Sequence, residues 1–357
     1  FGGRGLLEPD YQEDAWGAPI GPLPTVSSKI NWGEVEVKDE LAELYIVGAG
    51  TMGSELARQM VEMLGDEAED KVVVAETLTD ARHDELLSYG TLPKLRENRT
   101  EDDEYASRNV IVCIPPGKAN GYQGDYPEEL ADAFRLWAGP KGGGLFILVS
   151  STAIYGESDQ NTVTETFRVD SRSARSTRAI EAEAQVLERD GTIIRLAGLY
   201  NDQRGPHNYW CEKIARGETI DGDSDGIVNV LHYHDAASVA VQCIKSGSRS
   251  TVYLASDGNP ISRMDMCHAA IASKLYPLAE GKPVTFSGMA GYAKGKTVDC
   301  SWTETTLDWS PKYPSFNSYM RRLGGEDCPD PVKEKKGDKQ GESSILWMPG
   351  DDEDWAL

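Results

Sequence analysis

The chain has 357 residues, 39% of them hydrophobic, which is enough to bury the core of one large domain or two modest ones. Its 59 acidic and 36 basic residues give a net charge of −23, which argues against a nucleic acid partner, because binding a phosphate backbone requires Lys and Arg to replace counterions. No stretch approaches about eighteen consecutive apolar residues, so the sequence predicts no membrane-spanning helix.

Six cysteines are scattered singly through the chain: Cys113, Cys211, Cys243, Cys267, Cys300 and Cys328. Because this spacing lacks the close pairs of zinc sites and small disulfide frameworks, we expect reduced thiols in a reducing compartment. The chain begins at Phe1, and a Phe there resembles the cleavage site of plastid-targeting presequences in algae with complex plastids. We therefore expect the plastid stroma, with the cytoplasm as the alternative.

Residues 1–42 are rich in Gly, Pro and acidic residues without a helical or strand period, which predicts an extended arm. From residue 43 to residue 200, short apolar runs alternate with amphipathic segments, beginning with LYIVGAG, SELARQMVEML and KVVVAE and ending with GTIIRLAGLY. This alternation is typical of a parallel sheet with crossover helices. We predict a doubly wound α/β domain over residues 43–200.

After residue 200 the pattern loosens, and we expect a small α+β substrate lobe over residues 201–325, whose chain returns to the first domain. Its predicted elements are helices at HDAASVAVQCIKS and RMDMCHAAIASKLY and strands at TVYLAS and PVTFS. Residues 326–357 carry ten acidic and four basic residues, which is typical of a solvated tail, although ILWM, Trp355 and Leu357 offer apolar anchors. The arm and the tail are candidate docking segments for a protein partner.

The segment YIVGAGTMGSEL places Gly48, Gly50 and Gly53 in a G-x-G-x-x-G pattern between an apolar strand and an amphipathic helix. Such glycines allow a tight turn, a close approach of backbone to a diphosphate, and close packing of helix on strand, while the first N–H groups of the helix bind the phosphates. Thr51 and Met52 lie within the same turn. We therefore predict a dinucleotide-binding site here.

The sequence leaves the choice between NAD and NADP open. Glu76 ends the second strand about twenty residues after the last motif glycine and is placed to accept the ribose hydroxyls, which favours NAD. Thr77, Thr79 and Arg82 follow, and they could instead form a pocket for a 2′-phosphate. The run VIVCIPP brings Pro115 to the carboxyl edge of the sheet, near the expected cofactor ribose, although a proline-rigidified loop explains it at least equally well.

Four further sequence motifs follow the glycine segment along the chain: VSSTAIYG, IIRLAGLY, VNVLHYHDAA and GKTVDCSWTETTLDWSPKYPS. Together with GAGTMG they resemble the extended short-chain dehydrogenase/reductase superfamily, which includes the NAD-dependent epimerases and dehydratases, and most closely its atypical branch. The resemblance covers roughly residues 43–320. It implies a Rossmann domain, a small C-terminal substrate lobe and a site for NAD or NADP.

Members of this superfamily usually transfer a proton with a Tyr and with a Lys four residues later, on the helix after the SSTAIYG segment. This chain has no lysine between Lys141 and Lys213 and no tyrosine between Tyr155 and Tyr200. The corresponding helix begins with arginines, which keep their proton and make poor general bases. The resemblance implies that this loss is common in the atypical branch.

The resemblance also assigns individual positions. The three motif glycines match the phosphate loop, and Ser150, Ser151 and Thr152 match the strand end that faces the nicotinamide. Tyr155 matches a tyrosine that is usually structural. The remaining matches are Arg195, Gly198, His232, Asp235, Lys296 and Asp299.

The candidate catalytic residues are Thr152, Ser151 and Lys296. The two hydroxyls could orient a substrate carbonyl, and a bond to backbone at the strand end is an equally good structural interpretation. Lys296 arrives from a distant segment and could replace the absent lysine. The candidate substrate contacts are His207, Tyr209 and Arg195, of which the first two fall in a predicted polar loop.

His232 and His234 alternate along an extended segment, as metal ligands sometimes do. A third ligand of suitable spacing is missing nearby, and Asp235 is better explained as the N-cap of the following helix, so we expect no metal site.

Two functions stay open. The first is an NAD(P)-dependent oxidoreductase or epimerase acting on an unidentified small molecule. The second is a non-catalytic dinucleotide-binding subunit or sensor that docks on a larger, plastid assembly through residues 1–42 and 326–357. The missing Tyr and Lys favour the second function, and the intact glycine pattern indicates cofactor binding in both.

Overall fold

The computed structural model describes residues 35–115, 126–156, 161–170, 174–288 and 294–331, together with the paired short strands β1 (Gln12–Glu13) and β2 (Pro19–Ile20). Most of the predicted arm and tail lies outside these residues.

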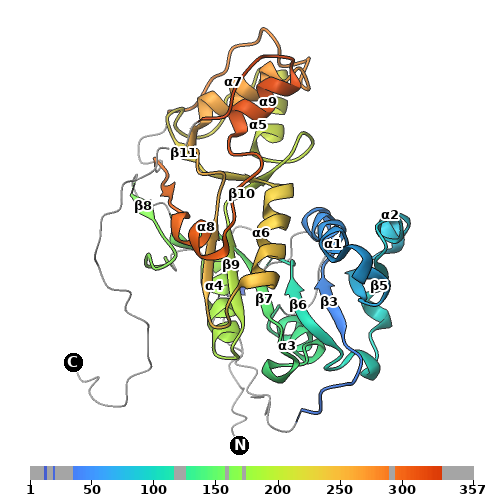
Figure 1. The fold of residues 1–357 in the computed structure, drawn as a ribbon. Helices are drawn as coiled ribbons and strands as arrows, with labels where there is room; N and C mark the ends of the chain where they lie inside the picture. The colour runs from blue at the N-terminus through green and yellow to red at the C-terminus, as the bar shows by residue number, and fades with distance from the viewer. Residues whose placement is uncertain are drawn as a thin grey trace, which may run out of the picture.

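A seven-stranded sheet forms the centre of the molecule, with all strands parallel and in the order β13-β9-β7-β6-β3-β4-β5 (Figure 1). Its strands are β3 (Ala42–Val47), β4 (Val73–Thr77), β5 (Leu92–Leu95), β6 (Ser107–Val112), β7 (Phe146–Ser151), β9 (Thr192–Leu196) and β13 (Val252–Ala255). The predicted doubly wound parallel sheet is confirmed.

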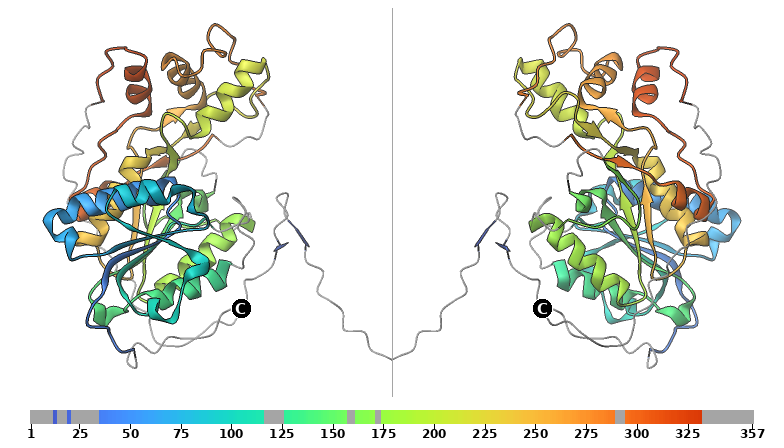
Figure 2. Two further views of the ribbon diagram at one scale, coloured as in Figure 1. Left: turned by 90° about the vertical axis from the view of Figure 1, so that its right-hand side faces the viewer. Right: turned by 90° about the vertical axis from the view of Figure 1, so that its left-hand side faces the viewer.

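Helices cover both faces of this sheet (Figure 2). On one face lie α1 (Thr51–Leu64) and α6 (Tyr233–Ser246), packed on β3 side chains such as Leu44 and Ile46. On the other face lie α3 (Tyr126–Leu136) and α4 (Ala174–Leu187), packed on side chains such as Tyr45 and Val47. Both faces are apolar because successive side chains of a strand point to opposite sides and each side is covered by helices.

The strand order reverses direction between β3 and β6, since the chain first builds outward through β4 and β5 and then returns to the other side of β3. In an open parallel sheet the crevice at the carboxyl ends of the strands beside such a reversal is where ligands bind. The fold therefore places the glycine turn that follows β3 at that crevice.

A smaller lobe stands above the carboxyl edge of the sheet in Figure 1 and contains α5 (Pro206–Arg216), α7 (Arg263–Ala272) and α9 (Phe316–Leu323). Three two-stranded pairings accompany these helices, and α8 (Ser301–Leu307) follows the last of them in the chain. The pairings are β10 (Gly198–Tyr200) with β12 (Val230–His232), β11 (Ile227–Val228) with β14 (Ile261–Ser262), and β8 (Thr162–Val163) with β15 (Thr297–Val298). The chain returns from the lobe to the sheet through α6 and β13.

Three local predictions are wrong. The polar loop expected around His207 is helix α5, which begins with Pro206, a residue favoured at the first helical position. The strand expected at PVTFS is reduced to a single bridge between Phe286 and Ile220. Asp235 is not the N-cap of α6, because the helix begins earlier and the Nδ1 atom of His232 caps it by accepting from the backbone N–H of His234 at 3.1 Å.

Asp235 instead holds a distant segment in place. Its buried carboxylate accepts from the backbone N–H of Lys312 at 2.8 Å and from that of Tyr313 at 2.9 Å. The carboxylate of Asp235 thus holds the segment before α9 against α6.

All six cysteines are free. Among the described residues, no helix is both long and apolar enough to cross a membrane.

Candidate functional site

The glycine turn joins β3 to α1 and leaves no room for side chains at two of its three glycines. Gly48 has a φ of 91°, and a Cβ there would lie 2.7 Å from the Cγ1 atom of Ile114. A Cβ on Gly53 would lie 2.6 Å from the carbonyl oxygen of Gly48. Gly50 differs, because a Cβ there would meet nothing within 4 Å. The first and third glycines are thus required by packing, whereas Gly50 leaves open space in front of the helix.

That open space is part of a cavity of about 520 Å³ at the carboxyl ends of β3, β6, β7 and β9. Seven of the predicted cofactor residues line it: Gly48, Gly50, Thr51, Met52, Gly53, Pro115 and Ser150. The N-terminus of α1 opens into the cavity, so its first N–H groups are available to an anion. The geometry suits a diphosphate at this end.

The far end of the cavity is where the superfamily's proton-transfer pair would be expected. Helix α4 contributes Ser176 and Ala179 to the lining, and the described lining includes no lysine. The lining residues include one tyrosine, Tyr233 at the start of α6, and one arginine, Arg204 in the turn after β10. Neither residue was among the sequence predictions, although VNVLHYHDAA places Tyr233 at a strand-to-helix junction.

Of the predicted catalytic residues, Ser151 lines the cavity, and its Oγ accepts from the backbone N–H of Ala153 at 3.2 Å. Thr152 is buried and lies outside the described lining. The Nζ atom of Lys296 donates to the carbonyl oxygen of Gly156 at 2.8 Å, also outside that lining. The structure thus brings one of the three candidates to the cavity wall.

Arg195 belongs to a buried network behind the cavity wall. Its Nη2 atom lies 2.6 Å from the Oε2 atom of Glu183, and its Nη1 atom donates to the Tyr155 hydroxyl at 2.9 Å. The Ser150 hydroxyl donates to Glu183 at 2.5 Å. Burial raises the pKa of Tyr155, and Arg195 opposes that shift. Arg195 therefore orients the strand-end serine through Glu183 and lies outside the described cavity lining.

The other predicted substrate contacts, His207 and Tyr209, lie on α5 in the lobe, outside the described lining. His207 is fully buried, and burial lowers its pKa to about 4. Tyr209 is 55% exposed, with the Nζ atom of Lys213 5.4 Å from its ring centre. The two residues lie on opposite faces of α5, His207 on the buried face and Tyr209 on the exposed face.

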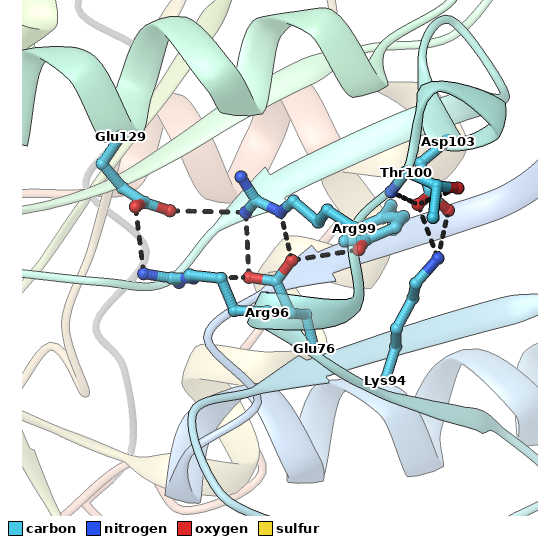
Figure 3. A network of polar contacts seen from close by, with 8 residues as sticks. Glu76, Lys94, Arg96, Arg99, Thr100, Asp103 and Glu129 are labelled. Carbon is cyan, nitrogen blue, oxygen red and sulfur yellow. Dashed lines mark hydrogen bonds and ion pairs between the residues drawn. The ribbon is translucent and has the colours of Figure 1, made fainter.

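Glu76 is fully buried in a network of four charged side chains (Figure 3). Its carboxylate accepts from the Nε atom of Arg96 at 2.9 Å and from the Nε and Nη2 atoms of Arg99 at 2.5 and 2.9 Å. The Tyr45 hydroxyl also donates to it, at 3.0 Å. Glu129 completes the network, with distances of 3.0 Å to Arg96 and 3.3 Å to Arg99. Both oxygens of Glu76 are thus engaged within the protein.

Thr77 and Arg82, the candidates for a 2′-phosphate, are each bonded to another side chain. The Thr77 hydroxyl lies 2.8 Å from the Nε2 atom of His83. The guanidinium of Arg82 pairs with Glu85 through its Nε and Nη2 atoms at 2.8 and 2.9 Å. Within the described ranges, no group of three or more His, Cys, Asp or Glu side chains is arranged to hold a metal ion.

No family model matches the chain, and no curated protein matches it. The chain does match solved structures. A conserved protein of unknown function from Silicibacter pomeroyi is 19% identical with a TM-score of 0.60, covering 80% of this chain and 98% of its own. The UDP-glucose 4-epimerase of Thermotoga maritima, solved with UDP-glucose, is 18% identical with a TM-score of 0.61, covering 80% of this chain and 98% of its own.

The dTDP-glucose 4,6-dehydratase of Bacillus anthracis, solved in complex with NAD, is 15% identical with a TM-score of 0.59, covering 80% of this chain and 96% of its own. At these identities the likeness shows the fold. The chain has a Rossmann fold with an added lobe, which is the fold that its sequence motifs predict.

Proposed function

We propose that this protein binds NAD or NADP, with the diphosphate at the glycine turn and the nicotinamide beside Ser150 and Ser151. The observation that carries the proposal is the turn itself: packing forbids side chains at Gly48 and Gly53, while Gly50 keeps the space before the α1 N-terminus free. Structures similar in fold support it, since the Bacillus anthracis dehydratase and a UDP-glucuronic acid 4-epimerase of Bacillus cereus were both solved with NAD.

The structure offers free backbone groups to the diphosphate, whereas the candidate residues for the adenosine ribose are already bonded to other side chains. Thr51 and Met52 bring backbone N–H groups of the first helical turn to the cavity, and Pro115 forms its wall beside β6. Glu76 stays a candidate for the ribose hydroxyls, although it would first have to release Arg96 or Arg99. Thr77 and Arg82 stay candidates for a 2′-phosphate. Titration with both dinucleotides distinguishes NAD from NADP.

When bound, the nicotinamide would supply hydride chemistry. We propose an oxidoreductase or epimerase-like reaction on a small molecule, with the Ser151 hydroxyl donating to a substrate oxygen. The hydroxyl is suited to this because its oxygen already accepts a backbone N–H and its proton is free to rotate toward the cavity.

Binding is tested by thermal unfolding and calorimetric titration with NAD, NADH, NADP and NADPH. We expect at least one of them to raise the unfolding temperature, by an amount that grows with its concentration. In Gly50→Asp the apo protein should unfold as the wild type does, because the space is open, but the added carboxylate should repel the diphosphate and remove the shift. Ala184→Glu adds the same charge on an exposed position of α4 and should leave binding intact. A shift that survives Gly50→Asp would place the ligand elsewhere.

The second candidate function is a dinucleotide-binding subunit or sensor without turnover, docked on a larger protein assembly through residues 1–42 and 326–357. It is favoured by the α4 positions facing the cavity, Ser176 and Ala179, which cannot carry out the usual proton transfer. Removal of residues 332–357 should then change the elution volume or the partners recovered from a cell extract, while dinucleotide binding persists. Unchanged partners, together with oxidation of a reduced dinucleotide by a carbonyl compound, would favour the enzyme.

A further inference from the structure

Two side chains reach the cavity from the β10–β12 pair, and the pairing itself explains why they meet there. The strands run in parallel with Tyr200 opposite His232, so both end at the same edge. Tyr233 is the next residue after β12, and Arg204 lies in the turn that follows β10. Arg204 and Tyr233, 29 positions apart in sequence (233 − 204), are thereby brought to the same cavity.

The turn that carries Arg204 is fixed by Asn201. The backbone N–H of Asn201 donates to the carbonyl oxygen of Arg204 at 2.8 Å, and the Asn201 side chain accepts from the N–H of Arg204 at 2.8 Å and of Gln203 at 2.9 Å. Tyr233 is fixed differently, by its place in the first turn of α6. There the side chain of Gln59 from α1 donates to the carbonyl oxygen of His234 at 3.0 Å. Two independent anchors thus bring the pair to the cavity.

Neither side chain is engaged elsewhere in the described part of the chain: both the Tyr233 hydroxyl and the Arg204 guanidinium lack a hydrogen-bond partner there. Both line the cavity that contains the glycine turn. A phenol and a permanent positive charge are the chemical components that the usual pair of a Tyr and a Lys supplies, although here they come from the lobe side and not from α4.

We propose that Tyr233 is the catalytic proton donor of this cavity and that Arg204 stabilises the phenolate left behind. The proposal rests on the proposed dinucleotide site. In the reducing direction, the carbonyl carbon of the substrate accepts a hydride from the reduced nicotinamide, whose ring is oxidised. The carbonyl oxygen takes the phenol proton and becomes an alcohol, and the phenolate then regains a proton from solvent.

Electrostatics around the phenol agree with this role. Burial raises the pKa of Tyr233, which keeps it protonated as a donor, and Arg204 is the charged group that opposes the shift. The titratable residues that follow Tyr233 on α6, His234 and Asp235, line a different cavity, and α1 carries Glu55. Asp235 is held by backbone N–H groups of the 312–313 segment, and Glu55 lies 2.6 Å from Arg58. Arg204 is therefore the group whose removal should change the phenol most.

The test observes Tyr233 directly and needs no known substrate. The full chain is labelled with 3-fluorotyrosine, the fluorine resonance of Tyr233 is identified by its loss in Tyr233→Phe, and its pH titration is followed. In Arg204→Ala we expect the midpoint to move to higher pH, whereas Arg204→Lys keeps the charge and should largely preserve it. Saturating NAD or NADP, whichever binds, should move the resonance of Tyr233 and leave that of Tyr209 unchanged.

A second measurement follows oxidation of the reduced dinucleotide with a panel of small aldehydes and ketones. Any carbonyl-dependent rate should fall about 10²–10⁴-fold in Tyr233→Phe, with dinucleotide affinity unchanged. The inference is overturned by a midpoint that does not respond to Arg204→Ala, by a Tyr233 resonance that ignores a bound dinucleotide, or by a rate that survives Tyr233→Phe. Failure of the proposed function looks different, because no dinucleotide would then raise the unfolding temperature.

Discussion

The buried charge network around Glu76 makes a strong prediction about stability. Glu76 has no exposed surface, and the side chains of Arg96 and Arg99 are 15% and 16% exposed. Replacing the carboxylate in Glu76→Gln leaves two guanidinium groups to share Glu129, whose side chain is 7% exposed. Breaking a buried ion pair from one side typically costs about 3–5 kcal/mol, because the remaining charge has lost its partner without regaining water.

We expect the lower end of that range, about 3 kcal/mol, since both arginines keep some contact with solvent and Gln retains an oxygen that accepts from Tyr45. For a chain of this size this corresponds to a fall in unfolding temperature of roughly 4 °C. The assay is urea unfolding followed by fluorescence and circular dichroism. The control is Glu62→Gln, because Glu62 is paired with Arg58 but its side chain is 62% exposed, so its loss should cost less than about 1 kcal/mol.

The same variant separates a structural role of Glu76 from a role in cofactor choice. If the carboxylate only neutralises Arg96 and Arg99, Glu76→Gln should weaken NAD and NADP binding by similar factors. If it binds the adenosine ribose, the variant should lose NAD affinity selectively. A loss of less than 1 kcal/mol in stability combined with a selective loss of NAD affinity would refute the structural interpretation.

Three further predictions concern single positions. Burial holds the pKa of both His207 and His232 to about 4, below the ordinary 6.5, so the unfolded chain binds more protons and stability present at neutral pH should be lost between pH 6.5 and 4. The loss is at most about 3 kcal/mol per histidine, and urea midpoints at pH 7 and pH 5 should reveal it, with a smaller change in His207→Phe. Gly53→Ala should destabilise the protein by about 1–3 kcal/mol and weaken dinucleotide binding, because its Cβ would collide with the Gly48 carbonyl oxygen, so an unchanged melting curve would contradict the geometry. Asp235→Ala leaves two backbone N–H groups without their acceptor and should increase amide hydrogen exchange at Lys312 and Tyr313, whereas a change confined to α6 would argue against this contact.

The glycine turn could be predicted from the sequence because everything it needs is local. The strand, the three glycines and the helix lie within about twenty residues, the positive φ of Gly48 is a property of the turn, and the Cβ excluded at Gly53 would meet the Gly48 carbonyl oxygen inside that segment. The same holds for the alternation of strands and helices that predicts the sheet. Local pattern was enough wherever the physical cause was also local.

The environment of Glu76 could not be predicted because it depends on β5, a strand whose sequence lacks the alternating apolar pattern of a strand. β5 contains Pro93 and Lys94, which interrupt its apolar period, yet it pairs with β4 and leads directly to Arg96 and Arg99. Helix α5 was missed for a related reason: its sequence PHNYWCEKIAR is polar, and only the lobe packing shows that His207 faces inward. In both cases tertiary contacts outweigh local preference.

Tyr233 and the glycine turn are held on two helices that pack against each other along the same face of the sheet. Glycine 50 precedes α1, Tyr233 begins α6, and the contact between Gln59 and the His234 carbonyl joins the helices close to the cavity. Because a packed helix pair moves as one body, a diphosphate fixed at α1 would have its distance to the phenol set by this packing. Arg204 lies on an exposed turn and lacks that restraint. Substitutions that loosen α1 against α6 should therefore impair proton transfer more than diphosphate binding, since only the former requires both helices to keep their relative position.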